Sequence, residues 1–124
     1  MNQQLKAFSA KPTYRKSDDV ADSLARASAY HRSGDLAKAQ AGYKKVLKKR
    51  PNHFDALHML GVCEQQCGNS EAAARSLRRA LLLDPKSVAI HSDLGTVLAV
   101  LRRFDEALAH CDQAIALLLS LIHI

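Results

Sequence analysis

Apolar residues recur along this chain at the three- and four-residue spacing of amphipathic helices. Glycine and proline interrupt the pattern at regular intervals. Glycine supplies the positive φ that ends a helix, and proline cannot extend one. The pattern therefore predicts helix pairs, and we expect Ser17 or Asp18 to cap the first helix. The predicted ranges are 20–33 with 36–49, 54–67 with 70–83, and 88 to the turn at 102–103 with 104–118.

Small residues repeat along the chain with a period of 34 residues. One set falls on the first helices and the other on the second helices: Ala27, Gly61 and Gly95, then Ala39, Ala73 and Ala107. Such a period is typical of helix–turn–helix repeats, whose single units bury too little apolar surface to be stable alone. We therefore predict an all-α solenoid of three repeats and six helices. Its expected core is formed by Leu57, Leu60, Leu77, Leu81, Leu94, Leu98 and Ile115, with Cys111 buried and His91 half-buried.

The repeats divide the chain into three parts. We expect a flexible basic leader over residues 1–17, three units over 18–118 (about 20–53, 54–87 and 88–118), and a separate tail over 119–124. The tail reads LSLIHI, although one period after Pro85 the pattern requires another proline. Its codons can match the mosaic end of a transposase-based sequencing library, so we interpret it as a translated adapter. The alternative is an apolar C-terminus that packs on the last helix.

Charge and composition narrow the function classes. The 124 residues carry a net charge of +6, most of it in the leader. No apolar run approaches the roughly 18–20 residues of a membrane span, and the first residues lack the apolar region of a secretory signal. Three cysteines without framework spacing favour free thiols. We therefore expect a cytoplasmic protein.

The repeated positions resemble those of the tetratricopeptide repeat (TPR) family over about residues 20–118. The first unit matches at Ala27, Tyr30, Gly34, Ala39, Tyr43, Val46 and Pro51. The second matches at Leu57, Leu60, Gly61, Gly68, Ala73, Leu77, Ala80 and Pro85. The third matches at Leu94, Gly95, Leu98, Phe104, Ala107 and Ala114. It departs at Arg102, where the other units have glycine, and at Leu119, where they have proline.

The resemblance implies a right-handed superhelix whose first helices line a concave groove for a peptide or protein partner. By this analogy the groove presents Ser28, His31, Asp55, His58, Gln65, Ser92 and Thr96. Some TPR proteins clamp a partner's terminal carboxylate with Lys, Arg and Asn on this face. Those places here hold Leu24, Ala25, Ser28, Asp55, His58 and Met59, which disfavours binding of chaperone tails. The leading interpretation is a protein-interaction module.

The runner-up belongs to the enzyme class. The segment HFDALHMLGVCEQQCGN is similar to bacterial proteins that place TPR units before a transferase domain, as O-GlcNAc transferases do. In those transferases an asparagine commonly precedes the Leu-Gly pair, whereas this chain has Met59 and Asp93 there. Because of the similarity of this segment, the alternative function is the substrate-recognition part of a larger bacterial glycosyltransferase.

Other candidate chemistry is weak. Cys63, Cys67 and His58 form a loose trio, but a metal site needs three or four converging ligands. We expect no catalytic residue, metal ligand or cofactor in this chain. Basic runs recur one period apart on the second helices: Lys44, Lys45, Lys48, Lys49 and Arg50, then Arg75, Arg78 and Arg79. We interpret them as a solvated face, because no aromatic residues interleave for nucleic-acid bases. Nucleic acid is the disfavoured partner, and the oligomeric state stays open.

Overall fold

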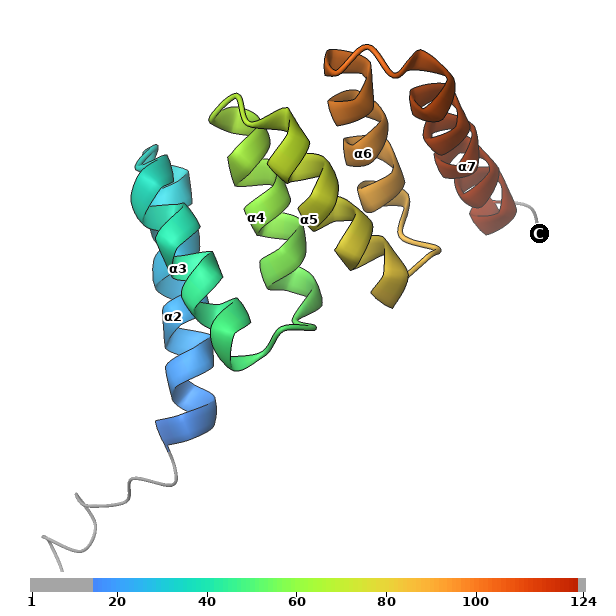
Figure 1. Ribbon diagram of the computed structural model, residues 1–124. Coiled ribbons are helices and arrows are strands. Elements are labelled where there is room, and N and C mark those ends of the chain that lie inside the picture. Colours follow the sequence, from blue (N-terminus) through green and yellow to red (C-terminus); the bar gives the residue numbers. More distant parts are fainter. Residues whose placement is uncertain (1–14, 123–124) are drawn as a thin grey trace, which may run out of the picture.

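The structure, a computed structural model, describes residues 15–122 of the chain. Its elements are all helices: α2 (Arg15–Ser33), α3 (Leu36–Lys49), α4 (Phe54–Gln66), α5 (Ser70–Leu83), α6 (Val88–Val100) and α7 (Phe104–Ile122). Successive helices pair as α2 with α3, α4 with α5, and α6 with α7, and the pairs stack in a row (Figure 1). The predicted all-α solenoid is thereby confirmed. Across the described range, no helix is long and apolar enough to cross a membrane.

Side-chain caps define where the internal helices begin. The side chain of the residue before each helix accepts a hydrogen bond from a backbone N–H in the first turn. These caps are Asp35 for α3, His53 for α4, Asn69 for α5 and Ser87 for α6. Pro51 and Pro85 lie in the turns that connect the pairs. Because each start has its own polar cap, these four helices begin at the residues that the sequence pattern predicts.

The two end helices are longer than expected. α2 begins at Arg15, so Ser17 and Asp18 lie inside the helix and the predicted cap is wrong. Arg and Lys are good helix formers, which favours this extension after Pro12. The predicted leader thus overlaps α2 at residues 15–17, and its other residues lie outside the described range. α7 continues through residues 119–122 of the predicted tail, whose non-native origin stays a prediction.

The core consists of three apolar clusters that lie within and between the helix pairs. Its largest fully buried side chains include Tyr43, Leu57, Leu77, Ile90, Leu94 and Leu98. The six small repeat positions are buried as well: Ala27, Ala39, Gly61, Ala73, Gly95 and Ala107. Leu60 is buried and Leu81 packs partly buried against the core, as expected. Cys63 is fully buried, which fits the small-residue packing expected for it.

Two expected core residues, Ile115 and Cys111, are exposed instead. In the first two pairs, the equivalent surface is covered by the first helix of the following pair. Among the described residues, no helix covers α6 and α7 in this way. An open apolar hollow of about 700 Å³ remains there, lined by Gly95, Thr96, Ala99, Val100, Phe104, Ala107, Leu108 and Cys111. The repeat pattern is the same in each unit, but burial depends on what lies next to the unit.

In each helix pair a glycine faces the partner helix at a point where a Cβ would come within 3 Å of it. A Cβ on Gly61 would lie 2.8 Å from Leu77 Cγ, and a Cβ on Gly95 would lie 2.7 Å from Cys111 Sγ. The first pair has alanine at the equivalent position, and the space is made by Gly42 on the opposite helix. A Cβ on Gly42 would lie 2.7 Å from the Cβ of Ala27. The sequence pattern does not reveal Gly42, because the residue one period later is Ser76 and not a glycine.

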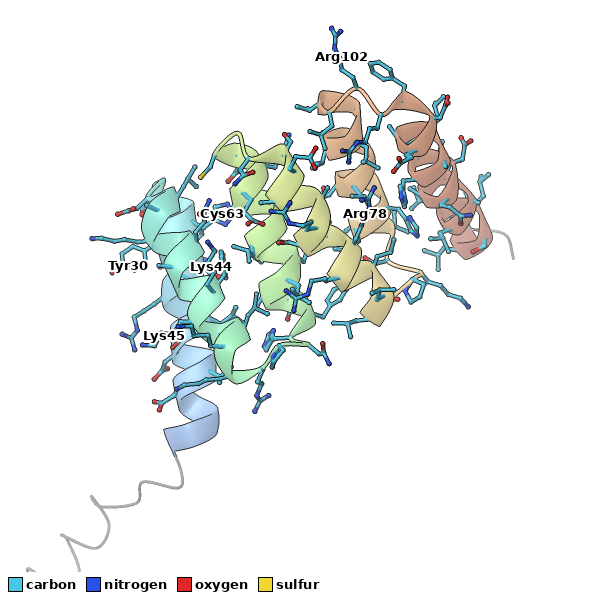
Figure 2. All side chains as sticks on the ribbon, in the orientation of Figure 1. Tyr30, Lys44, Lys45, Cys63, Arg78 and Arg102 are labelled. Carbon is cyan, nitrogen blue, oxygen red and sulfur yellow. The ribbon has the colours of Figure 1, made fainter. Side chains whose placement is uncertain are left out.

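Each pair turns through a residue in the left-handed backbone region. Gly34 and Gly68 have φ of +88° and +84°, and Arg102 occupies the third equivalent place with φ of 63°. Figure 2 labels Arg102 at the turn between α6 and α7. The third unit therefore keeps the turn geometry of the others, although its residue carries a Cβ that disfavours this conformation.

We expect Arg102→Gly to stabilise the protein by about 1 kcal/mol, since it relieves the cost of left-handed backbone in a residue with a side chain. Urea unfolding followed by circular dichroism measures the change. Arg102→Ala is the matched control, because it removes the guanidinium but keeps the strained Cβ. Equal stabilisation by both variants would mean that the side chain, and not the backbone, is responsible.

A histidine pair joins α6 to α7. His91 is buried, and its Nε2–H donates to the carbonyl oxygen of Pro85 at 2.8 Å. Its Nδ1 therefore accepts, so the Nδ1–H of His110 donates to it at 3.0 Å. Burial holds the pKa of His110 below its usual value, with contributions from His91 and Arg78 that Glu106 opposes. His91 is more deeply buried than the half-buried position expected from the sequence.

Because of this histidine pair, we expect the protein to lose stability in mild acid. The unfolded chain takes up a proton at the ordinary histidine pKa of about 6.5, whereas folded His110 resists protonation. Its contribution is therefore complete above that value and is lost as the pH falls below it. Urea midpoints measured between pH 8 and pH 5 test this. His110→Gln, which cannot titrate, should flatten the dependence, and an unchanged slope in that variant would contradict the assignment.

Candidate partner-binding face

The first helices α2, α4 and α6 place all seven predicted groove residues at the surface. Asp55, Ser92 and Thr96 are exposed. The other four are partly exposed: Ser28, His31, His58 and Gln65. We call the surface formed by these seven residues the first-helix face. None of them lies in the core, so this surface is open to a partner.

A hollow of about 300 Å³ lies between α2 and α4 on the first-helix face. It is lined by Ser28, His31, Arg32, Tyr43, Met59 and Val62. Two of these residues were predicted for the groove. Met59 and Val62 were not, although Val62 lies four residues beyond His58 and thus on the same side of α4. The volume suits one or two side chains of a bound segment.

A side-chain hydrogen bond joins α4 to α6 on this face. The Nε2–H of His58 donates to Asp93 Oδ2 at 2.8 Å, and both side chains are partly exposed. Asp93 directly precedes the Leu-Gly pair of the third unit. The contact therefore holds two successive first helices together at the surface that a partner would meet.

An equivalent link joins α2 to α4. The ring of His31 lies between the hydroxyl of Tyr43, 3.2 Å from Nδ1, and Gln66 Oε1, 2.5 Å from Nε2. An amide oxygen only accepts, so Nε2 carries the proton and Nδ1 accepts from the tyrosine hydroxyl. Each link spans 35 residues, from one first helix to the next. Sequence spacing placed the two histidines on the face but did not reveal their partners.

The seven predicted residues do not converge on one point. Ser28 and His31 border the hollow, and His58 bonds to α6. Gln65 accepts a hydrogen bond from the Ser70 hydroxyl at 3.0 Å, near the turn between α4 and α5. Asp55 lies at the other end of α4, beside the connecting loop. An extended surface of this kind suits a bound chain segment better than a small molecule.

Within the described part of the chain, the cysteines and histidines do not converge on one centre. Burial raises the pKa of Cys63 to about 11, with additional effects of Cys67 and Glu64, so its thiol stays protonated at neutral pH. The thiol donates to the carbonyl oxygen of Leu36 at 3.4 Å. Among residues 15–122, no group of three or more His, Cys, Asp or Glu side chains is placed to hold a metal ion.

Comparisons with known proteins agree with this geometry. A human FK506-binding protein-like protein is 37% identical over 65 residues, which are 52% of this chain and 19% of that protein. An O-GlcNAc transferase of Thermobaculum terrenum, solved as a mutant, superposes with a TM-score of 0.77 and 33% identity. The match covers 83% of this chain and 20% of the transferase. This chain thus spans about one fifth of the length of each.

Two further structures share the arrangement of helices. A crystal structure of MamA protein has a TM-score of 0.78 and 28% identity, over 82% of this chain and 55% of that one. The second TPR of Spaghetti (RPAP3), solved with an HSP90 peptide, has a TM-score of 0.76 and 16% identity, over 79% and 91%. Three family models described as tetratricopeptide repeat match residues 23–53, 43–75 and 64–118, which span the helix pairs. The chain belongs to the tetratricopeptide repeat family.

Proposed function

We propose that this chain is a protein-interaction module that binds a peptide or protein segment on the first-helix face. The observation that carries the proposal is the pair of histidine links, His31 to Gln66 and His58 to Asp93, which fix successive first helices relative to each other. A face that is already ordered before binding loses less conformational entropy when a partner arrives. The hollow beside Met59 and Val62 then offers an anchor for an apolar side chain.

A structural neighbour supports peptide binding by this architecture, because the Spaghetti domain is solved with an HSP90 peptide. At 16% identity the likeness concerns the fold, and the partner has to be argued from this chain's own residues. Its first-helix face carries Asp55, with Asp93 bonded to His58 beside it, and the places of a carboxylate clamp hold no Lys or Arg. The two carboxylates disfavour an acidic tail, and Arg32 in the lining of the hollow disfavours a strongly basic one. We therefore propose a partner segment that is close to neutral.

Peptides selected from a displayed library against the whole chain test this function. Ser92→Arg with Thr96→Arg adds bulk and charge to the exposed surface of α6 without removing either histidine link. Ala109→Arg with Ala116→Arg makes the same charge change at exposed positions of α7. We expect only the first pair to weaken a selected peptide, by at least about tenfold, as for the loss of central contacts in an interface. Equal weakening by both pairs would overturn the proposal.

A second candidate role is substrate recognition within a larger glycosyltransferase. It rests on the 33% identity to the Thermobaculum terrenum O-GlcNAc transferase, which extends over most of this chain. Sequencing the surrounding gene separates the two roles. Further repeats followed by a transferase domain would support the enzyme, whereas a polar capping helix and a stop codon would support an adaptor. The cytoplasmic location stays a prediction in either case.

A further inference from the structure

A second groove lies between α3 and α5, away from the first-helix face. It encloses about 430 Å³ and is lined by Lys44, Leu47, Lys48, Leu60, Glu64, Ala72, Arg75, Ser76 and Arg79. We call it the basic groove. Its α4 residues, Leu60 and Glu64, are each two positions from Val62, which lines the hollow on the first-helix face. Two positions on a helix correspond to a rotation of about 200°. The groove therefore lies on the opposite side of α4.

Four cationic side chains from two repeats line the basic groove. Lys44 and Lys48 come from α3, and Arg75 and Arg79 come from α5 (Figure 2 labels Lys44). The ion pairs found among residues 19–122 involve other basic groups, such as Arg78 with Glu106 and Arg103 with Glu71. Arg79 donates to the carbonyl oxygen of Pro51 at 3.0 Å, which is a neutral partner. The cations are thus available to an anionic ligand.

The floor of the groove combines apolar side chains with one buried carboxylate. Leu47, Leu60 and Ala72 provide the apolar part. Glu64 is buried, and its Oε1 accepts a hydrogen bond from the Ser76 hydroxyl at 2.6 Å. One carboxylate against four cations leaves three positive charges without compensation in one concave surface. Such a concave surface raises the local concentration of anions.

The spacing of the cations indicates which anion fits. On each helix the two cations are four residues apart, which places them about 6 Å apart along the axis. In an extended peptide, side chains two residues apart point the same way and are about 6.6 Å apart. Alternate acidic side chains of one extended segment can therefore meet Lys44 and Lys48 on one side and Arg75 and Arg79 on the other. α3 and α5 run in the same direction, so both sides keep this spacing (Figure 1).

We propose that the basic groove binds an extended peptide segment that carries a run of about four acidic residues, as the matched spacings require. A nucleic acid fits less well. The nine lining residues include no aromatic ring on which a base could stack. This site goes beyond the proposed function, because it uses the other side of the array and a ligand of different charge.

Fluorescence anisotropy with a labelled peptide containing four consecutive glutamates tests the site on the whole chain. Lys48→Glu with Arg75→Glu reverses one cation on each side. Arg26→Glu with Lys86→Glu makes the same change in net charge at exposed positions outside the groove. We expect the groove variant to weaken binding at least about tenfold and the control less than about twofold, because only close charge pairs couple strongly. Equal weakening by the two variants would overturn the proposal.

Two further arms make the outcome decisive. A peptide with its four glutamates spaced four residues apart should bind more weakly than the contiguous one, whereas equal affinity would contradict the spacing argument. A single-stranded oligonucleotide of equal charge that binds more tightly than the peptide would contradict the assignment to acidic peptides. If the charge-reversal variant loses helicity, the neutral variant Lys48→Gln with Arg75→Gln is measured in its place, and the same weakening of peptide binding is expected. Ser92→Arg with Thr96→Arg should leave this binding unchanged, so the two proposals fail separately.

Discussion

Leu77→Ala should lower the free energy of unfolding by about 2–5 kcal/mol, the range for truncating a buried leucine. Leu77 is fully buried in the core cluster that joins α5 to α6. Its Cγ lies 2.8 Å from the Cβ position that Gly61 leaves empty, so no larger neighbour is available to fill the cavity. The middle pair also supports both other pairs, because each unit of a solenoid depends on its neighbours.

The control for this variant lies on the same helix. Leu82 is 81% exposed, so Leu82→Ala makes the same chemical change outside the core and should alter the stability by less than about 0.5 kcal/mol. Urea unfolding monitored at 222 nm by circular dichroism compares the two variants under one condition. A similar loss in both would contradict the placement of Leu77 at the centre of the array.

The second large effect concerns the approach of α2 to α3. Gly42→Ala should destabilise the protein by about 1–3 kcal/mol, although alanine is the better helix former by about 1 kcal/mol. The added Cβ would lie 2.7 Å from the Cβ of Ala27 and 3.3 Å from its Cα. Neither atom can rotate away, because both positions are fixed by the backbone of α2. The two helices would therefore have to move apart.

Gly95→Ala provides the matched control for Gly42→Ala. Its added Cβ meets Cys111 Sγ at 2.7 Å, but that side chain is exposed and its sulfur can rotate. We expect this variant to be neutral or slightly stabilising. Ala27→Gly should in turn restore the stability lost in Gly42→Ala, since it removes the Cβ that clashes with the added one. Thermal unfolding of the single and double variants measures this coupling, and simple additivity of the two changes would contradict the contact.

The fold could be predicted from the sequence because the same signals occur three times. Proline ends, glycine turns and polar caps recur one period apart, so the bounds of α3 and α5 match the predicted ranges. Features that do not repeat with the period are not visible in the sequence pattern. In the first pair, Gly42 on the second helix provides the space that Gly61 and Gly95 provide on the first helices of the other two pairs. Arg102 departs from the glycine of the other units, but only the backbone shows that it keeps the left-handed turn.

Burial and side-chain partners could be predicted less well. Cys111 and Ile115 occupy positions that read as core, yet their exposure depends on a neighbouring helix and not on their own unit. The repeat pattern placed His31 and His58 on the first-helix face, but their links to Gln66 and Asp93 depend on side-chain conformation and on stacking. The basic groove likewise forms only where α3 and α5 lie on either side of α4. The sequence therefore indicates its basic side chains but not the apolar residues and the carboxylate that lie between them.

Chemical-shift mapping of the isotope-labelled chain tests the central claim, that a partner segment binds on the first-helix face. A peptide selected against the whole protein is titrated into it, and the amide shifts are assigned to helices. The account predicts that the largest changes fall on α2, α4 and α6, around Ser28, His58 and Thr96. Changes confined to α3, α5 and α7, with the first helices unaffected, would contradict it.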